Sequence, residues 1–188
     1  MNYPLSDDLR AGFADGSLPE AFDLVLATHL SLQGAAGIAT LGGAMLEATE
    51  PVAMADGALD AALGRIRQSK PKPKKEDLAE IFPEPLRSKL GADAAFAPWQ
   101  VVSQGVQEIV LPAEGNATAR LFSVAPGHAI PAVGGAGKVV TLVLQGAYAA
   151  GDSRFVRGDI AEEAAQSESG QVAEPGDPCI CLVAAEHG

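Results

Sequence analysis

One histidine stands where a metal-binding helix would place a ligand. His29 lies near the end of an expected helix, in the stretch ATHLSLQGAAG. A histidine in that position often anchors a metal together with cysteines just downstream, because imidazole and thiolates suit zinc. No cysteine follows it here. A lone imidazole does not hold zinc at useful affinity, so the question is what else His29 does.

The thiol chemistry of the chain is confined to two residues. Cys179 and Cys181 lie in PCICLVAA, whose alternation is typical of a strand and places both side chains on one face. Two residues apart on an extended strand, they have poor geometry for a disulfide. We therefore expect two buried strand cysteines that pack as small apolar residues.

Composition narrows the classes of function. The chain has 188 residues, 47% of them hydrophobic and 5% aromatic, and a net charge of -11. Such an acidic chain repels nucleic acid and is compatible with a basic protein partner. Its first residues lack a signal-peptide pattern, and no apolar run approaches the roughly 18 residues of a membrane span. We expect a cytoplasmic protein.

The elements that position His29 are expected to be short helices. Ser6 and Gly16 delimit the first, and Ser17 is expected to cap a second that ends near Gln33. Two more are expected in 35–48 and 57–68 from helical spacing of apolar residues. Together they predict a small helical domain over residues 1–69.

The last expected helix carries the candidate partner surface. Its apolar stripe consists of Leu59, Leu63 and Ile66. The first two helices can cover each other, through Leu9, Phe13, Phe22, Val25 and Leu26. The stripe at 57–68 has no later element in its domain to cover it, which indicates a partner-binding surface. The alternative is that the stripe folds back on the third helix.

The residue composition and the pattern of apolar residues change along the chain, which divides it into two parts. Residues 70–85 are rich in lysine and proline and predict an extended, solvated linker. From residue 86 to 188, short alternating apolar runs are separated by Gly, Pro, Asn and Asp turns, which predicts an antiparallel β-barrel or sandwich. The predicted fold class is α + β, a helical bundle followed by a jelly-roll barrel.

Within the β half, GHAIPAVGGAGKVVTLVLQG resembles the first cupin motif, and RGDI at 157–160 resembles the opening of the second. The resemblance implies a divalent metal inside the barrel, held by histidines and a glutamate. The positions that match these metal ligands hold Val133, Gly135, Val139 and Ser169. Of the four, only the serine could bind a metal, and only weakly. His128 lies on the wrong side of Pro131 and is expected to be a strand or loop residue.

The N-terminal segment, DDLRAGFADGSLPEAFDLVLATHLSL, resembles the zinc-binding domain of ChrR-type anti-sigma factors, and the likeness continues through IVLP, VTLVLQGAY and CICLVAA. It covers nearly the whole chain. His29 matches the helical zinc histidine of that family. The two cysteine positions hold Gln33 and Ala36, and an earlier histidine position falls near Pro4. We therefore expect no metal and no other cofactor.

The resemblance implies an anti-sigma factor that binds an extracytoplasmic-function (ECF) sigma factor and represses transcription. Family members sense an oxidative signal such as singlet oxygen through the cupin half, and the missing ligands argue against a metal-based sensor here. One alternative is a metal-free cupin-fold binding or structural protein, natural or engineered. A cupin enzyme is the other, and the lost ligands argue against it because such chemistry needs a bound metal.

Overall fold

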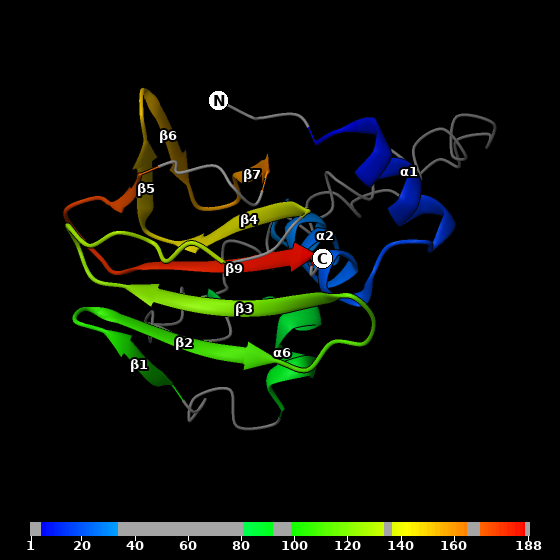
Figure 1. Cartoon of the computed structure of the whole chain (residues 1–188), viewed down its shortest axis with the longest axis horizontal. Coiled ribbons are helices and arrows are strands. Elements are labelled where there is room, and N and C mark those ends of the chain that lie inside the picture. Colours follow the sequence, from blue (N-terminus) through cyan, green and yellow to red (C-terminus); the bar gives the residue numbers. More distant parts are fainter. Residues whose placement is uncertain (1–4, 34–80, 92–98, 134–136, 165–169, 187–188) are drawn as a thin grey trace, which may run out of the picture.

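The computed structural model describes residues 5–33, 81–91, 99–133, 137–164 and 170–186 (Figure 1). Its helices are α1 (Asp7–Asp15), α2 (Glu20–Gln33) and α6 (Glu84–Leu90). Its strands are β1 (Gln100–Ser103), β2 (Val106–Leu111), β3 (Ala117–Val124), β4 (Lys138–Gln145), β5 (Ala147–Ala150), β6 (Ser153–Val156), β7 (Ile160–Ala164), β8 (Gln171–Ala173) and β9 (Cys179–Glu186).

Helix α1 forms as its capping residues predict. The Ser6 side chain accepts a hydrogen bond from the Leu9 backbone N–H, which satisfies one of the free donors of the first turn. Asp7 and Asp8 place negative charge at the positive end of the helix. Gly16 ends the helix in the left-handed conformation, at φ 72°. Both expected boundaries of α1 are confirmed.

Helix α2 begins later than its expected cap. It starts at Glu20, and the Pro19 carbonyl accepts from the backbone N–H groups of Phe22 and Asp23. Ser17 instead continues the turn after α1, since its N–H donates to the Gly12 carbonyl. The helix runs as far as Gln33, the last described residue before the gap at 34–80, so its expected end near Gln33 stays a prediction.

The strands form two antiparallel sheets. One has six strands in the order β1-β2-β3-β9-β4-β7, and the other has three in the order β6-β5-β8. Strand β9 lies between β3 and β4, so the C-terminal strand closes the middle of the large sheet (Figure 1). This arrangement confirms the prediction of α + β architecture with a cupin-like antiparallel β domain.

Alternation along the central strands gives the large sheet two apolar faces. On β9, Cys179, Cys181 and Val183 belong to an inner core that also contains residues of the three-stranded sheet. Between them, Ile180 and Leu182 belong to an outer core on the opposite face. Strand β4 alternates in the same way, and the sheet is therefore packed on both faces.

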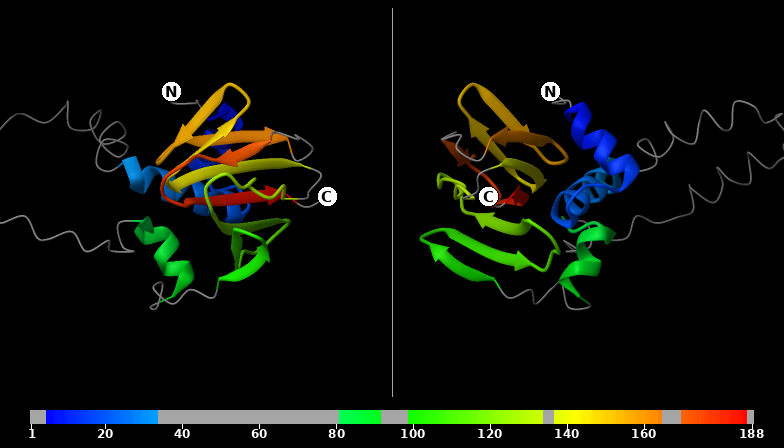
Figure 2. Two further views of the ribbon diagram at one scale, coloured as in Figure 1. Left: turned by 90° about the vertical axis from the view of Figure 1, so that its left-hand side faces the viewer. Right: turned by 45° about the vertical axis from the view of Figure 1, so that its right-hand side comes forward.

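The helices cover the outer face of the large sheet. Helix α2 contacts β3, β9 and β4, and α6 packs against α2 (Figure 2). Phe22 and Leu86 from these helices are 1% and 0% exposed and share one core with Leu182 of β9. Burying each such side chain contributes about 1.5–3 kcal/mol. The helices and the barrel thus share an outer core.

The end of the predicted linker also packs into this core. Phe82 was expected in the solvated segment at 70–85, but it is 1% exposed and lies among the residues of the outer core. The free energy gained by burying its aromatic ring favours packing, although the residues before it in the sequence are mostly polar. Residues 70–80 lie outside the described part of the chain, and the predicted domain boundaries at 69 and 86 stay predictions. Across the described residues, none of the helices has the length and apolar character to cross a membrane.

Candidate functional site

The predicted partner-binding stripe falls outside the described residues. Leu59, Leu63 and Ile66 lie in the range 34–80, which the structure does not describe. The stripe therefore stays a prediction. The same range holds the third and fourth expected helices. What the structure does describe is how the first two helices, which carry His29, are held.

The apolar residues expected to join α1 to α2 contact the barrel as well. Leu9, Phe22 and Val25 are at most 3% exposed and belong to the core that includes Leu142 and Leu182 of the sheet. Helix α2 contacts β3, β9 and β4 of the sheet and also packs against α6, so half of its side chains, from Ala21 to His29, are buried. The helices therefore pack against the barrel and not only against each other.

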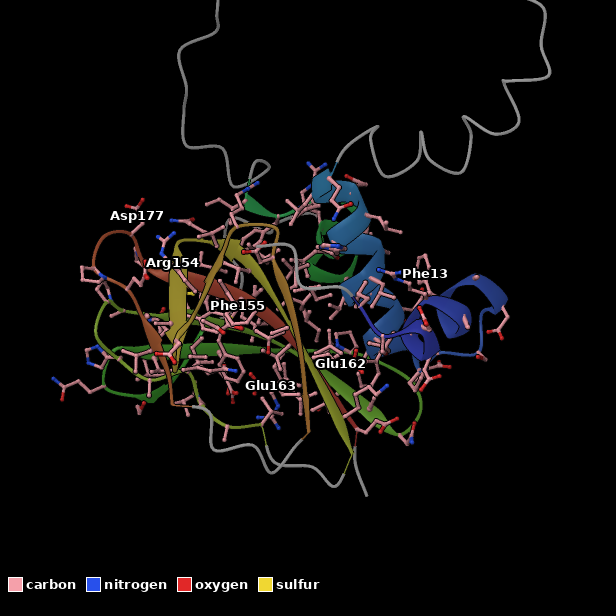
Figure 3. The ribbon with its side chains drawn as sticks, turned by 90° about the horizontal axis from the view of Figure 1, so that it is seen from above. Phe13, Arg154, Phe155, Glu162, Glu163 and Asp177 are labelled. Atoms are coloured by element: carbon pink, nitrogen blue, oxygen red, sulfur yellow. The ribbon has the colours of Figure 1, made fainter. Side chains whose placement is uncertain are left out.

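A carboxylate on the barrel fixes the start of α1. Glu162 of β7 accepts hydrogen bonds from the Ser6 backbone N–H at 3.1 Å and from the Ser6 hydroxyl at 3.0 Å. It also pairs with the Lys138 ammonium at 2.9 Å. Burial raises the pKa of Glu162, but the hydrogen bonds from Lys138 and Ser6 outweigh burial and lower the pKa overall. Figure 3 shows Glu162 on the side of the barrel where Phe13 of α1 lies.

A second carboxylate fixes the start of α2. Glu20 pairs with the Lys89 ammonium of α6 and accepts from the backbone N–H of Glu114, in the loop between β2 and β3, at 2.6 Å. The hydrogen bond from Lys89 lowers the pKa of Glu20, with help from Glu114. The two carboxylates thus hold the first turns of both helices against the barrel.

His29 packs where α2 meets the barrel. Its side chain is 5% exposed, and its Nε2 lies 2.8 Å from the Gln33 Nε2. The Gln33 side-chain amide and the imidazole thus form a hydrogen bond across one turn of α2. Burial lowers the pKa of His29, and the Gly158 backbone and the Asp159 carboxylate oppose that shift only partly. His29 is therefore a neutral, buried imidazole at neutral pH.

The positions that the cupin resemblance assigns to metal ligands are apolar where the structure describes them. Val133 is 7% exposed, and half-buried Val139 packs against the same inner core. Gly135 and Ser169 lie outside the described residues. Neither valine offers a donor atom. Within the described ranges, no three His, Cys, Asp or Glu side chains come together as a metal would need.

The inner core next to these valines is aromatic and thiol-lined. The Tyr148 and Phe155 rings stack with centroids 4.8 Å apart, and Cys179 and Cys181 are fully buried beside them. Both thiols are free and lie on one face of β9, as the sequence predicted. The hydrogen bond to Cys179 and burial raise the pKa of Cys181 well above its ordinary value. A protonated, buried thiol is a poor nucleophile and a poor metal ligand.

His128 occupies a loop, as expected. Its ring lies directly over Gly105, where an added Cβ would meet the imidazole at 2.7 Å. Its Nδ1 lies 3.2 Å from the Pro126 carbonyl. The ring thus packs the loop before Ile130 against the turn between β1 and β2, and it stands apart from the inner core.

Sequence reasoning missed the two anchoring carboxylates. Neither Glu20 nor Glu162 is among the candidate site residues that the sequence predicts. Their partners lie 69 residues away for Lys89 and 156 residues away for Ser6. No local spacing rule links residues so far apart. The available signal was the opposite charge of Lys89, but its pairing with Glu20 depends on how α6 packs against α2.

The chain is similar to known proteins over nearly its whole length. Residues 87–187 match the family model described as ChrR cupin-like domain. The anti-sigma-E factor ChrR of Cereibacter sphaeroides is 36% identical over 192 residues, covering 99% of this chain and 90% of that protein.

A solved structure agrees with this relationship. A chain in the crystal structure of Rhodobacter sphaeroides SigE in complex with the anti-sigma ChrR is 37% identical, with a TM-score of 0.68. The match covers 99% of this chain and 100% of that chain. Because helices and barrel are matched together, the likeness is not restricted to the cupin fold.

Proposed function

The chain belongs to the ChrR family of anti-sigma factors, and we propose that it binds an ECF sigma factor and keeps it from RNA polymerase. The observation that supports this most is the match to ChrR over 99% of the chain, at 36% identity, which includes the helices as well as the barrel. Family membership makes the chain a regulator and not an enzyme. A net charge of -11 fits a partner with a basic surface.

We place the partner-binding surface on the segment 57–68, which the sequence predicts to be helical. The supporting feature is the stripe formed by Leu59, Leu63 and Ile66. In the described part, the apolar faces of α1 and α2 are used against the barrel, so these helices offer little apolar surface to a partner. A helix with one apolar stripe binds in the groove of a partner through residues at this spacing.

We place this activity in the cytoplasm, because a sigma factor acts on RNA polymerase there. The signal that releases the sigma factor in this chain is a separate matter from binding. Binding itself requires only a surface on the helices and a scaffold that holds them.

The test is direct binding to purified ECF sigma factors, with SigE of Rhodobacter sphaeroides among them. Leu63→Glu should weaken binding by about tenfold or more, equal to about 1.4 kcal/mol. The matched control is Ala61→Glu, which adds the same charge on the opposite side of the expected helix. Helical content by circular dichroism should stay the same in both variants.

Two results would speak against the proposed surface. Equal weakening by both variants would mean that charge alone opposes binding. Loss of helical signal together with binding in Leu63→Glu would mean that Leu63 is a core residue, which is the alternative in which the stripe folds back on the third helix.

A further inference from the structure

We propose that the barrel of this chain is a metal-independent scaffold, in which an apolar core occupies the place that the family resemblance gives to a metal, and this core supports the sheet that carries the helices. The first observation is the inner core itself. Val133 and Val139 pack with Tyr148, Phe155 and Cys181. At these two described positions, apolar side chains thus stand where imidazole and carboxylate would have pointed inward.

Two carboxylates that remain near this core have other partners. Glu163 stands opposite Val139 in the β4–β7 pairing, and its carboxylate accepts from the Gln171 side chain at 2.9 Å. In Figure 3, Glu163 and Phe155 both lie among the strands of the barrel, away from the helices. The Asp159 carboxylate accepts from the Val156 backbone N–H at 3.0 Å, which holds the turn before β7. Each carboxylate stabilises the barrel where it stands.

The thiols and the phenol do not supply a replacement site. The hydrogen bond between Cys179 and Cys181 lowers the pKa of Cys179 and, together with burial, raises the pKa of Cys181 well above its ordinary value, and among the described residues no third metal-binding side chain joins the pair. Zinc binds cysteine as thiolate. Burial likewise raises the pKa of Tyr148, whose hydroxyl is enclosed in the inner core. A neutral phenol between aromatic and thiol neighbours is a packing residue.

The inner core also supports the surface on which the helices pack, because the side chains of β4 and β9 point alternately to the two faces of the sheet. Val143 and Cys181 point into the inner core, and Leu142 and Leu182 point toward α2. The register pairs Leu142 with Leu182 and Val143 with Cys181. The same two strands therefore carry both cores. Packing inside the barrel fixes the surface on which the helices lie.

The first test measures metal directly on the full, tag-free chain. The protein is incubated with excess zinc chloride, desalted and analysed for zinc, and its thermal unfolding is recorded with zinc and with EDTA. We expect well under one zinc per chain and the same melting temperature in both. Retention of one zinc per chain, with a lower melting temperature in EDTA, would overturn the proposal.

The second test puts a metal-binding residue back at a buried position. Val133→His should lower the melting temperature, because it buries an imidazole in an apolar core. The adjacent Ala132→His, on an exposed residue, is the matched control and should leave it unchanged. Zinc should not restore the stability of Val133→His. Equal stability of the two variants, or rescue by zinc, would overturn the proposal.

A milder pair of variants keeps the test decisive if Val133→His does not fold. Val133→Thr changes shape little but buries a hydroxyl, and Ala132→Thr again serves as control. The valine variant should melt lower than the alanine variant, and equal melting temperatures would overturn the proposal. Metal content and unfolding are measured on the chain alone, so their outcome is separate from that of sigma-factor binding.

Discussion

His29 is held as a neutral imidazole between α2 and the turn at Gly158. Its pKa lies below the ordinary value of 6.5 because the side chain is buried. In the unfolded chain the ring takes up a proton near the ordinary pKa. The unfolded state therefore binds more protons than the folded state just below pH 6.5, and stability falls as the pH is lowered through this range.

The prediction concerns His29→Gln, which removes the titrating ring and keeps a polar side chain. Denaturant unfolding between about pH 5 and 7 should depend less steeply on pH in the variant, by up to about 1.4 kcal/mol per pH unit. His128→Gln, in a loop away from the cores, is the control. An unchanged slope in His29→Gln would show that His29 is protonated equally in both states.

Acid titration of the anchoring carboxylates falls in a lower range. The pKa values of Glu20 and Glu162 are lowered from 4.5 by their hydrogen-bond partners. The stability that they contribute is present above about pH 4.5 and is lost as the pH falls through their folded pKa values. The effect of His29 can therefore be measured before either carboxylate is protonated.

At the scale of elements, the turn between β4 and β5 depends on a glycine. Gly146 has a φ of 71°, and a Cβ there would lie 2.9 Å from the Pro178 carbonyl oxygen and 3.1 Å from the Cys179 Cα. The close neighbours are backbone atoms, which cannot move away cheaply. Gly146 thus allows β4 to turn into the small sheet while passing the start of β9.

Gly146→Ala should be destabilised by both backbone strain and steric overlap. Gly151→Ala is the matched control, because its φ is 56° and nothing lies within 4 Å of an added Cβ. We expect the control to lose about 1–2 kcal/mol and Gly146→Ala to lose at least about 1 kcal/mol more. If chemical denaturation shows the same loss of unfolding free energy in both variants, the backbone at the start of β9, near Cys179, must shift to make room for the added methyl group.

Much of the fold could be predicted from local patterns. Ser6 and Gly16 marked α1 because capping is a local interaction, and alternation placed both cysteines on one face of β9. Strand β7 was missed because its sequence, IAEEA, carries two adjacent acids and no clear alternation. One of these acids, Glu162, accepts a hydrogen bond from Ser6. The other, Glu163, accepts one from the Gln171 side chain of β8. Tertiary partners, not propensity, hold this strand.

The candidate site was less predictable than the fold. The loss of metal ligands was visible at Val133 and Val139, because a valine has no donor atom. What the valines do instead, filling an inner core with Tyr148 and Phe155, depends on which strands face each other. The seating of α2 on the sheet was likewise invisible, since an apolar helix face shows that it is buried but not against which partner.

At the scale of the molecule, the helices and the barrel should unfold together. The only tryptophan, Trp99, packs against the outer core between sheet and helices, whereas Tyr148 lies in the inner core. We expect the unfolding curves from Trp99 fluorescence and from near-ultraviolet circular dichroism to coincide, because β4 and β9 belong to both cores. Two separate transitions would show that the helices leave the barrel before it unfolds.

The central claim is that this chain is an anti-sigma factor that works without metal. The most direct measurement is its dissociation constant for the ECF sigma factor it binds, found with a panel that includes SigE, in buffer with EDTA and in buffer with zinc. We predict tight binding with the same dissociation constant in both buffers. Failure to bind any member of the panel, or binding that is lost in EDTA, would contradict the account.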